Sequence, residues 1–133
     1  MDRRKFLKVA PACLLLGCAT VPMHRAEVRD GKLLVDEAEL ELFWLKSSAV
    51  IVHNGTVSAV LLRQAGGGYR ALEADCPHLG CQVRPGKKVI TCPCHGSAFA
   101  LDGQVLRGPA ERSLLTYPIE RRDGILEITI YSE

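Results

Sequence analysis

The sequence predicts an all-β protein, a small antiparallel sandwich or barrel, and two observations support this fold class. Short segments rich in Val, Ile and Leu alternate with turn pairs such as Asn54-Gly55 and Asp123-Gly124, a pattern typical of β-hairpins. No window has the apolar periodicity of a long amphipathic helix. With 133 residues, the chain is long enough for one domain and too short for two of ordinary size.

The expected elements follow the turn residues along the chain. Asp30-Gly31 and Asn54-Gly55 each separate two strands, the glycines at 66–68 precede another, and Asp123-Gly124 joins the last two. Residues 36–43 can form a short helix or a turn. In order, the predicted strands are 26–29, 32–35, 48–53, 56–62, 69–74, 87–91, 114–120 and 125–131.

The N-terminus reads as a targeting segment. Residues 1–8 are basic, the apolar run at 9–16 is too short to span a bilayer, and Gly17-Cys18 follows it. The start resembles a twin-arginine export signal, and the end resembles a lipoprotein cleavage site, which implies a lipidated Cys18. We therefore expect a signal peptide at 1–17, a tether at 18–25 and one domain at 26–133.

Composition and charge exclude several classes of protein. Apolar residues make up 47% and charged residues 24% of the chain, which is a globular balance and excludes extended disorder. The formal net charge is +2, but the expected signal peptide carries most of the positive charge. Without residues 1–17 the net charge is −1, so the mature chain lacks the basic surface that nucleic-acid binding requires.

Residues that can carry chemistry are concentrated in two boxes. The first box, CPHLGC, spans 76–81, and the second, CPCHGS, spans 92–97. Each box combines cysteines with a histidine at short spacing, and a strand-like stretch separates them, which is typical of a metal site closed by two loops. Zinc bound by two Cys and two His, a disulfide framework, and a mixed Cys and His site for two irons are the candidates. The last accounts for most of the pattern.

The two boxes resemble the cluster-binding boxes of Rieske iron-sulfur proteins, of the disulfide-containing type found in cytochrome bc-type complexes. The likeness extends loosely from about Val28 to Ile130. It implies a small Rieske-type β-domain with a cluster-binding subdomain at about 75–110 inserted between strands, and one [2Fe-2S] cluster. The implied iron ligands are Cys76 and Cys92 on one iron and His78 and His95 on the other.

The resemblance also assigns roles around the cluster. It implies a disulfide between Cys81 and Cys94, which an oxidising compartment would preserve. Ser97 matches a serine whose hydroxyl points at a bridging sulfide, whereas Phe99 stands where high-potential members carry a tyrosine that donates to a ligand sulfur. We therefore expect a lower potential than in those members. Leu79 matches a residue that shields the cluster, and Pro109 a residue that shapes the adjoining loop.

These features predict an exported, lipid-anchored electron carrier on the periplasmic side of a bacterial membrane. The first expectation is the iron-sulfur subunit of a quinol-oxidising bc-type complex, with a cytochrome b-type donor and a c-type cytochrome as acceptor. Such a chain is a subunit of an oxidoreductase rather than a complete enzyme. The alternatives are the small subunit of an arsenite-oxidase-like molybdenum enzyme, a stand-alone Rieske ferredoxin, and a zinc-binding structural lipoprotein.

Overall fold

The computed structural model describes residues 21–77, 80–94 and 96–130. The expected positions Cys18, His78, Leu79 and His95 lie outside these residues. The elements, in chain order, are β1 (Met23–Arg25), β2 (Glu27–Arg29), β3 (Lys32–Asp36), the 3-10 helix η2 (Glu37–Leu40), α2 (Glu41–Trp44), β4 (Ala49–His53), β5 (Ser58–Arg63), β6 (Tyr69–Glu73), β7 (Arg84–Pro85), β8 (Val89–Thr91), β9 (Ala98–Ala100), β10 (Val105–Arg107), β11 (Thr116–Tyr117), β12 (Ile119–Arg122) and β13 (Ile125–Thr129).

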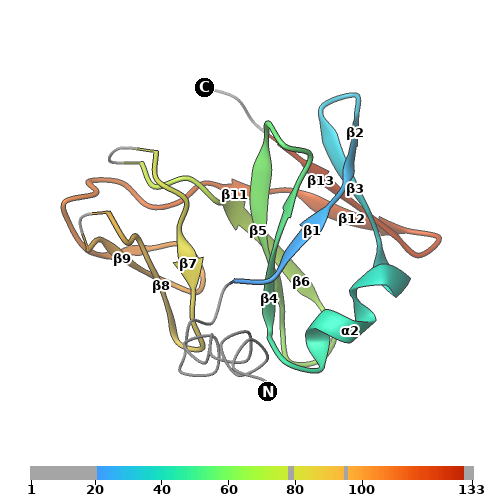
Figure 1. The fold of residues 1–133 in the computed structure, drawn as a ribbon, viewed down its shortest axis with the longest axis horizontal. Coiled ribbons are helices and arrows are strands. Elements are labelled where there is room, and N and C mark those ends of the chain that lie inside the picture. Colours follow the sequence, from blue (N-terminus) through green and yellow to red (C-terminus); the bar gives the residue numbers. More distant parts are fainter. Residues whose placement is uncertain (1–20, 78–79, 95, 131–133) are drawn as a thin grey trace, which may run out of the picture.

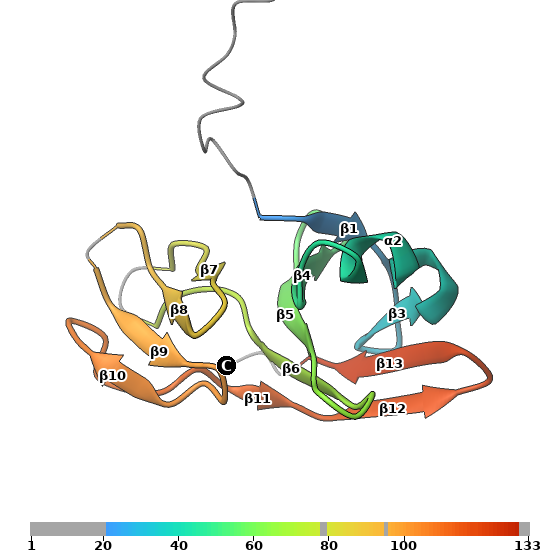
Figure 2. The same ribbon diagram turned by 90° about the horizontal axis from the view of Figure 1, so that it is seen from below.

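Three sheets build the domain, and the five-stranded sheet β1-β4-β5-β6-β11 lies between the other two. On one side are β12-β13-β3-β2, and on the other β10-β9-β8-β7 (Figures 1 and 2). Among the described residues, no helix is long and apolar enough to cross a membrane. The mostly antiparallel β-fold predicted from the sequence is confirmed.

The central sheet is apolar on both faces because both faces are covered. Successive side chains of a strand point to opposite faces. Ile51 of β4 therefore enters the core shared with the four-stranded sheet of β7–β10, while its neighbours Val50 and Val52 enter the core shared with β3 and β13. On β5, Val60 enters the first of these cores and Leu61 enters the second. This explains why both strands read as continuous apolar runs.

The insertion expected at about 75–110 is the sheet β7–β10, which lies between β6 and β11 in the chain. We call it the cluster subdomain. Its strands pair in antiparallel fashion, with β9 between β8 and β10. Phe99 on β9 faces Ile90 on one side and Val105 on the other, and its side chain is fully buried. The subdomain thus has its own small sheet, which packs on the central sheet through this apolar side.

A polar cluster connects three elements at the other end of the molecule. The Tyr69 hydroxyl on β6 donates to Glu37 Oε2 at 2.7 Å, and Arg121 Nε on β12 donates to Glu37 Oε1 at 3.0 Å. A second Arg121 nitrogen also contacts this carboxylate. Hydrogen bonds from Arg121 and then from Tyr69 lower the pKa of Glu37 below its ordinary value of 4.5, because they favour the charged form.

The structure corrects two details of the sequence-based fold. Met23–Arg25 fall within the predicted tether at 18–25, but they form β1 and pair in parallel with β4. The strand predicted at 114–120 is divided at Pro118, with β11 in the central sheet and β12 in the outer one. Both differences concern pairing between distant segments, which local sequence patterns do not specify.

Candidate metal centre

The first box is a closed loop between β6 and β7. The amide of Cys76 donates to Cys81 O at 2.7 Å, and the amide of Gly80 donates to Cys76 O at 2.7 Å. Gly80 has a φ of +79°, a left-handed conformation that glycine adopts without steric cost. Asp75 and Gln82 form an isolated antiparallel bridge at the base of the loop. Burial, together with the charge of Glu73, raises the pKa of Asp75.

The second box, between β8 and β9, repeats this backbone arrangement. The amide of Cys92 donates to Ser97 O at 2.8 Å, and the amide of Gly96 donates to Cys92 O at 3.0 Å. Gly96 has a φ of +83°. In each box, therefore, the leading cysteine donates to the carbonyl five residues later and accepts from the glycine amide four residues later. Cys76 and Cys92 occupy equivalent positions in the two loops.

A disulfide between Cys81 and Cys94 joins the two boxes, as the resemblance implied. Their Cα atoms are 6.4 Å apart, which is within the usual range for a disulfide. The Sγ atoms of Cys81, Cys92 and Cys94 all lie within 4.8 Å of one another. Since two of these sulfurs are bonded to each other, they cannot serve as thiolate ligands, and a site made of these three cysteines is excluded.

The remaining two cysteines of the described chain suit an iron-sulfur cluster. Cys76 and Cys92 are outside the disulfide, and their residues are only 2% and 3% exposed. Both belong to the apolar cluster that also contains Phe99. A thiolate in apolar surroundings is costly unless a metal or another positive charge stabilises it. Two such thiols lie at equivalent positions in loops that a disulfide joins. They therefore fit one iron of a [2Fe-2S] cluster, since cysteine thiolates hold such clusters.

Ser97 ties the second box to the segment that follows β10. Its side chain is fully buried, and its Oγ accepts a hydrogen bond from the amide of Ala110 at 3.0 Å. A hydroxyl can accept and donate at the same time, so this contact leaves the Ser97 hydrogen available to a second partner. The Ala110 segment includes a cis peptide bond between Gly108 and Pro109. Pro109, which is expected to shape a loop, thus directly precedes the residue that donates a hydrogen bond to Ser97.

Arg107 makes a contact that the sequence did not reveal. Its Nε donates to Gly96 O at 3.0 Å, so an exposed guanidinium is fixed on the second box. Arg107 reaches this carbonyl because β10 pairs with β9, which places it opposite Ala98. In the sequence it is merely a basic residue before Gly108-Pro109, and nothing local to it signals a partner eleven residues away.

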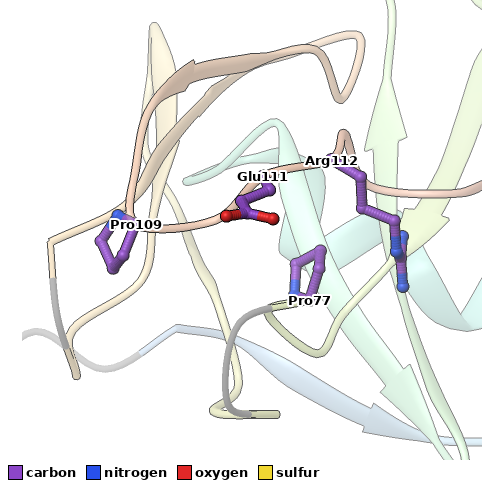
Figure 3. A pocket seen from close by; sticks show the side chains of 4 residues that line it. All are labelled: Pro77, Pro109, Glu111 and Arg112. Atoms are coloured by element: carbon purple, nitrogen blue, oxygen red, sulfur yellow. The ribbon is translucent and has the colours of Figure 1, made fainter.

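A hollow of about 720 Å³ lies beside the first box, lined by Pro77, Pro109, Glu111 and Arg112. Figure 3 shows the Glu111 side chain between Pro109 and Pro77, and the Arg112 side chain beyond Pro77. The Arg112 guanidinium makes a two-pronged ion pair with Glu73, with nitrogen to oxygen distances of 2.9 and 3.1 Å. The first box is thus bordered by charged residues from the segment after Pro109, which the sequence analysis did not single out.

Comparisons with known proteins agree with this arrangement. A sequence model of the Rieske [2Fe-2S] domain matches residues 23–118. The cytochrome b6-f complex iron-sulfur subunit of Chlorobaculum tepidum is 36% identical over 73 residues, which cover 53% of this chain and 40% of that protein. The corresponding subunit of Synechococcus sp. (strain JA-3-3Ab) is 42% identical over 67 residues, which cover 49% of this chain and 33% of that subunit. The matched region thus spans less than half of each of these two relatives.

A solved structure shows the same fold. The cyanobacterial plasma membrane Rieske protein PetC3 from Synechocystis PCC 6803 superposes with a TM-score of 0.59 at 28% identity, over 78% of this chain and all of that one. The family match covers most of the described residues and includes both boxes. The chain therefore belongs to the family of Rieske [2Fe-2S] domains, is related to the iron-sulfur subunits of cytochrome b6-f complexes, and has a [2Fe-2S] cluster as its cofactor.

Proposed function

We propose that Cys76 and Cys92 bind one iron of the cluster and that His78 and His95 bind the other. The proposal is supported by the two buried thiols at equivalent loop positions, since each expected histidine follows its cysteine within three residues. The disulfide holds the boxes together and removes Cys81 and Cys94 from the possible ligands. This arrangement is the observation that carries the proposed function.

The residues around the boxes would tune the site. In this proposal the Ser97 hydroxyl donates toward a sulfide of the cluster, while its oxygen accepts from Ala110. Hydrogen bonds to the sulfurs stabilise the reduced, more negative state and raise the potential. Phe99 has no donor, so the contribution that a tyrosine would make is missing. Leu79 would shield the cluster, and Pro109 would shape the adjoining loop.

The function that we propose is one-electron transfer outside the cytoplasm. When bound, the cluster supplies a centre that accepts and releases one electron. The resemblance implies imidazole ligands that can exchange a proton with a donor such as a quinol. The first assignment is the iron-sulfur subunit of a quinol-oxidising bc-type complex, with a cytochrome b-type donor and a c-type cytochrome as acceptor. It rests on the relatives, which are named as cytochrome b6-f subunits.

The location that we propose is the periplasmic side of a bacterial membrane. Residues 1–17 would be a signal peptide, and Cys18 would carry the lipid anchor. Two observations support an exported protein, namely the disulfide, which persists in oxidising compartments, and the likeness to a solved Rieske protein of a plasma membrane. The net charge of −1 without residues 1–17 argues against nucleic acid as a partner.

A second candidate is the small subunit of a molybdenum enzyme resembling arsenite oxidase. One observation favours it, which is the buried phenylalanine at position 99, the residue type expected from that resemblance. Gly96 argues against it, since the second box of that family usually lacks this glycine. The donor in this case would be the molybdenum subunit instead of a quinol.

Three measurements on protein isolated from its native host test these proposals. We expect two irons and two acid-labile sulfides per chain, and an electron paramagnetic resonance (EPR) signal of the reduced state that shows mixed nitrogen and sulfur ligation. Co-purification with cytochromes b and c would support the bc-type complex, and co-purification with a molybdenum subunit would support the second candidate. One zinc per chain without labile sulfide would refute the whole assignment.

A further inference from the structure

The two most exposed large apolar side chains of the described residues lie close together, Leu42 in α2 and Leu45 directly after it. Leu42 is 77% and Leu45 is 78% exposed, whereas the next large apolar residue, Leu106, is 59% exposed. Leu42 and Leu45 line a mainly apolar hollow of about 630 Å³. Its other lining residues are Pro22, Glu39, Phe43 and Lys46. We call this surface the α2 face. Highly exposed leucines that line a common hollow often mark a contact surface.

The start of the described chain is fixed to this face. The amide of Ile51 donates to Pro22 O at 2.9 Å, and β1 continues the attachment by pairing with β4. His24 on β1 lies 3.2 Å from a carboxylate oxygen of Glu39, and its ring meets Phe43 edge-on at 5.9 Å. Figure 2 shows β1 and α2 on the same side of the molecule. From Pro22 onward, the chain is therefore bound to the domain beside the α2 face.

We propose that the α2 face docks on the phospholipid bilayer that holds the anchor, with Leu42 and Leu45 inserted among the acyl chains. This inference rests on the proposed lipidation of Cys18. Cys18 is four residues before Pro22, and a fully extended chain spans at most about 14 Å over that length. An anchored head must therefore keep Pro22, and with it the adjacent α2 face, close to the membrane.

The charges around the leucines agree with a phospholipid surface. Lys46 lines both this hollow and a second one of about 400 Å³, which Lys87 also lines. Lysines beside exposed leucines are typical of protein surfaces that lie on a bilayer, because the ammonium groups can reach phosphates. Glu39 is turned toward His24, and Glu41, the exposed acid of the helix, lines neither hollow.

The geometry of the docked head suits an electron carrier. In both views β9 lies at the opposite end of the molecule from α2, and Figure 2 shows β10 beside it. Contact through the α2 face would leave β9 and β10, at the far end of the cluster subdomain, free to meet protein partners. The short connection would also restrict the reach of the head, so that its donor and acceptor must both come to the membrane surface.

The chain contains its own probe for this contact. Trp44 is its single tryptophan and lies in α2 between Leu42 and Leu45. The experiment uses the full-length protein, processed by an exporting host and reconstituted in vesicles of phosphatidylcholine and phosphatidylglycerol, with or without brominated acyl chains. We expect brominated lipid to quench Trp44 emission in the wild type. The L42S/L45S variant should stay on the vesicles but lose this quenching, and the matched surface variant L106S should keep it.

Several results would overturn the proposal, and they separate it from the proposed anchor. Vesicle-bound protein whose Trp44 emission is insensitive to bromine, or quenching that survives in L42S/L45S, would refute the docking while leaving the anchor intact. A concentration-dependent change in Trp44 emission without a bromine effect would assign the face to a second copy of the chain. Protein that does not sediment with vesicles would refute the anchor and the docking together. The EPR signal would still test electron transfer independently.

Discussion

Replacing Phe99 with tyrosine tests whether the missing hydroxyl sets the potential of this protein. The Phe99 ring is fully buried in the apolar cluster that contains Cys76 and Cys92. A tyrosine at this position would bring a hydroxyl into surroundings where the sulfurs of Cys76 and Cys92, the proposed ligands, are the polar groups it is expected to reach. We therefore expect the midpoint potential of F99Y to rise, because a hydrogen bond to sulfur is stronger in the more negative reduced state.

The size of the shift follows from hydrogen-bond energies. Bonds to neutral groups contribute about 1 kcal/mol and bonds to charged groups about twice as much. If reduction strengthens the new bond by about 1 kcal/mol, the potential rises by about 40 mV, since a tenfold change in equilibrium corresponds to about 59 mV for one electron. Without a partner, the buried hydroxyl would instead lower the free energy of unfolding by about 1 to 3 kcal/mol.

Two measurements on the same variants distinguish these outcomes. Redox titration followed by EPR gives the midpoint potential, and chemical denaturation gives the free energy of unfolding. F99L is the control, because it keeps an apolar side chain and adds no donor, so it should not raise the potential. An F99Y protein with a normal EPR spectrum and an unchanged midpoint would contradict the reasoning, as would an equal rise in F99L.

Three further predictions concern the loops and the polar cluster. Replacing both disulfide cysteines in C81A/C94A should lower the free energy of unfolding by about 3 kcal/mol, since the bond closes a loop with a sequence separation of 13 residues; a loss below about 1 kcal/mol in urea denaturation would contradict this. R107Q removes the cation on Gly96 O and should lower the midpoint potential by about 20 mV, as expected for an exposed charge contributing about 0.5 kcal/mol, whereas R107K should lower it less. Because the pKa of Glu37 is lowered from 4.5, its stabilising contribution is present above that pH and is lost as the pH falls through the lowered value. The melting temperature of E37Q should therefore fall less steeply than that of the wild type below about pH 4.5. An equal fall in both proteins would exclude a contribution of the Glu37 charge to stability.

The hairpins could be predicted because turn chemistry is local. Asp30 and Gly31 both have positive φ angles, as do Asp123 and Gly124, which is what a tight turn between antiparallel strands demands. At the hairpin between β4 and β5, Asn54 Oδ1 accepts hydrogen bonds from two following amides. In each case a residue pair determines the conformation of its own segment, and the sequence is sufficient.

The arrangement of the sheets could not be predicted in the same way. β1 consists of three residues, MHR, whose sequence shows no alternation of apolar and polar types, and it forms a strand only because β4 provides a partner for it. Pro118 divides the segment before the last hairpin between two sheets, a division that depends on where β6 and β13 lie. For the same reason the contact of Arg107 with the second box was missed. The cysteine spacing, which is local, identified both boxes, and the family resemblance that the boxes carry implied the disulfide.

The two boxes differ at their third, fourth and sixth residues, and the difference at the sixth bears on how the site is held. Their backbones make the same pair of hydrogen bonds, but the sixth residue is Cys81 in the first box and Ser97 in the second. Cys81 fixes its loop to the other box through Cys94, while Ser97 fixes its loop to Ala110 behind β10. The disulfide therefore links the first box to the second, and the contact of Ser97 with Ala110 links the second box to the segment after β10. A perturbation in β10 should reach both loops, whereas loss of the disulfide should release mainly the first.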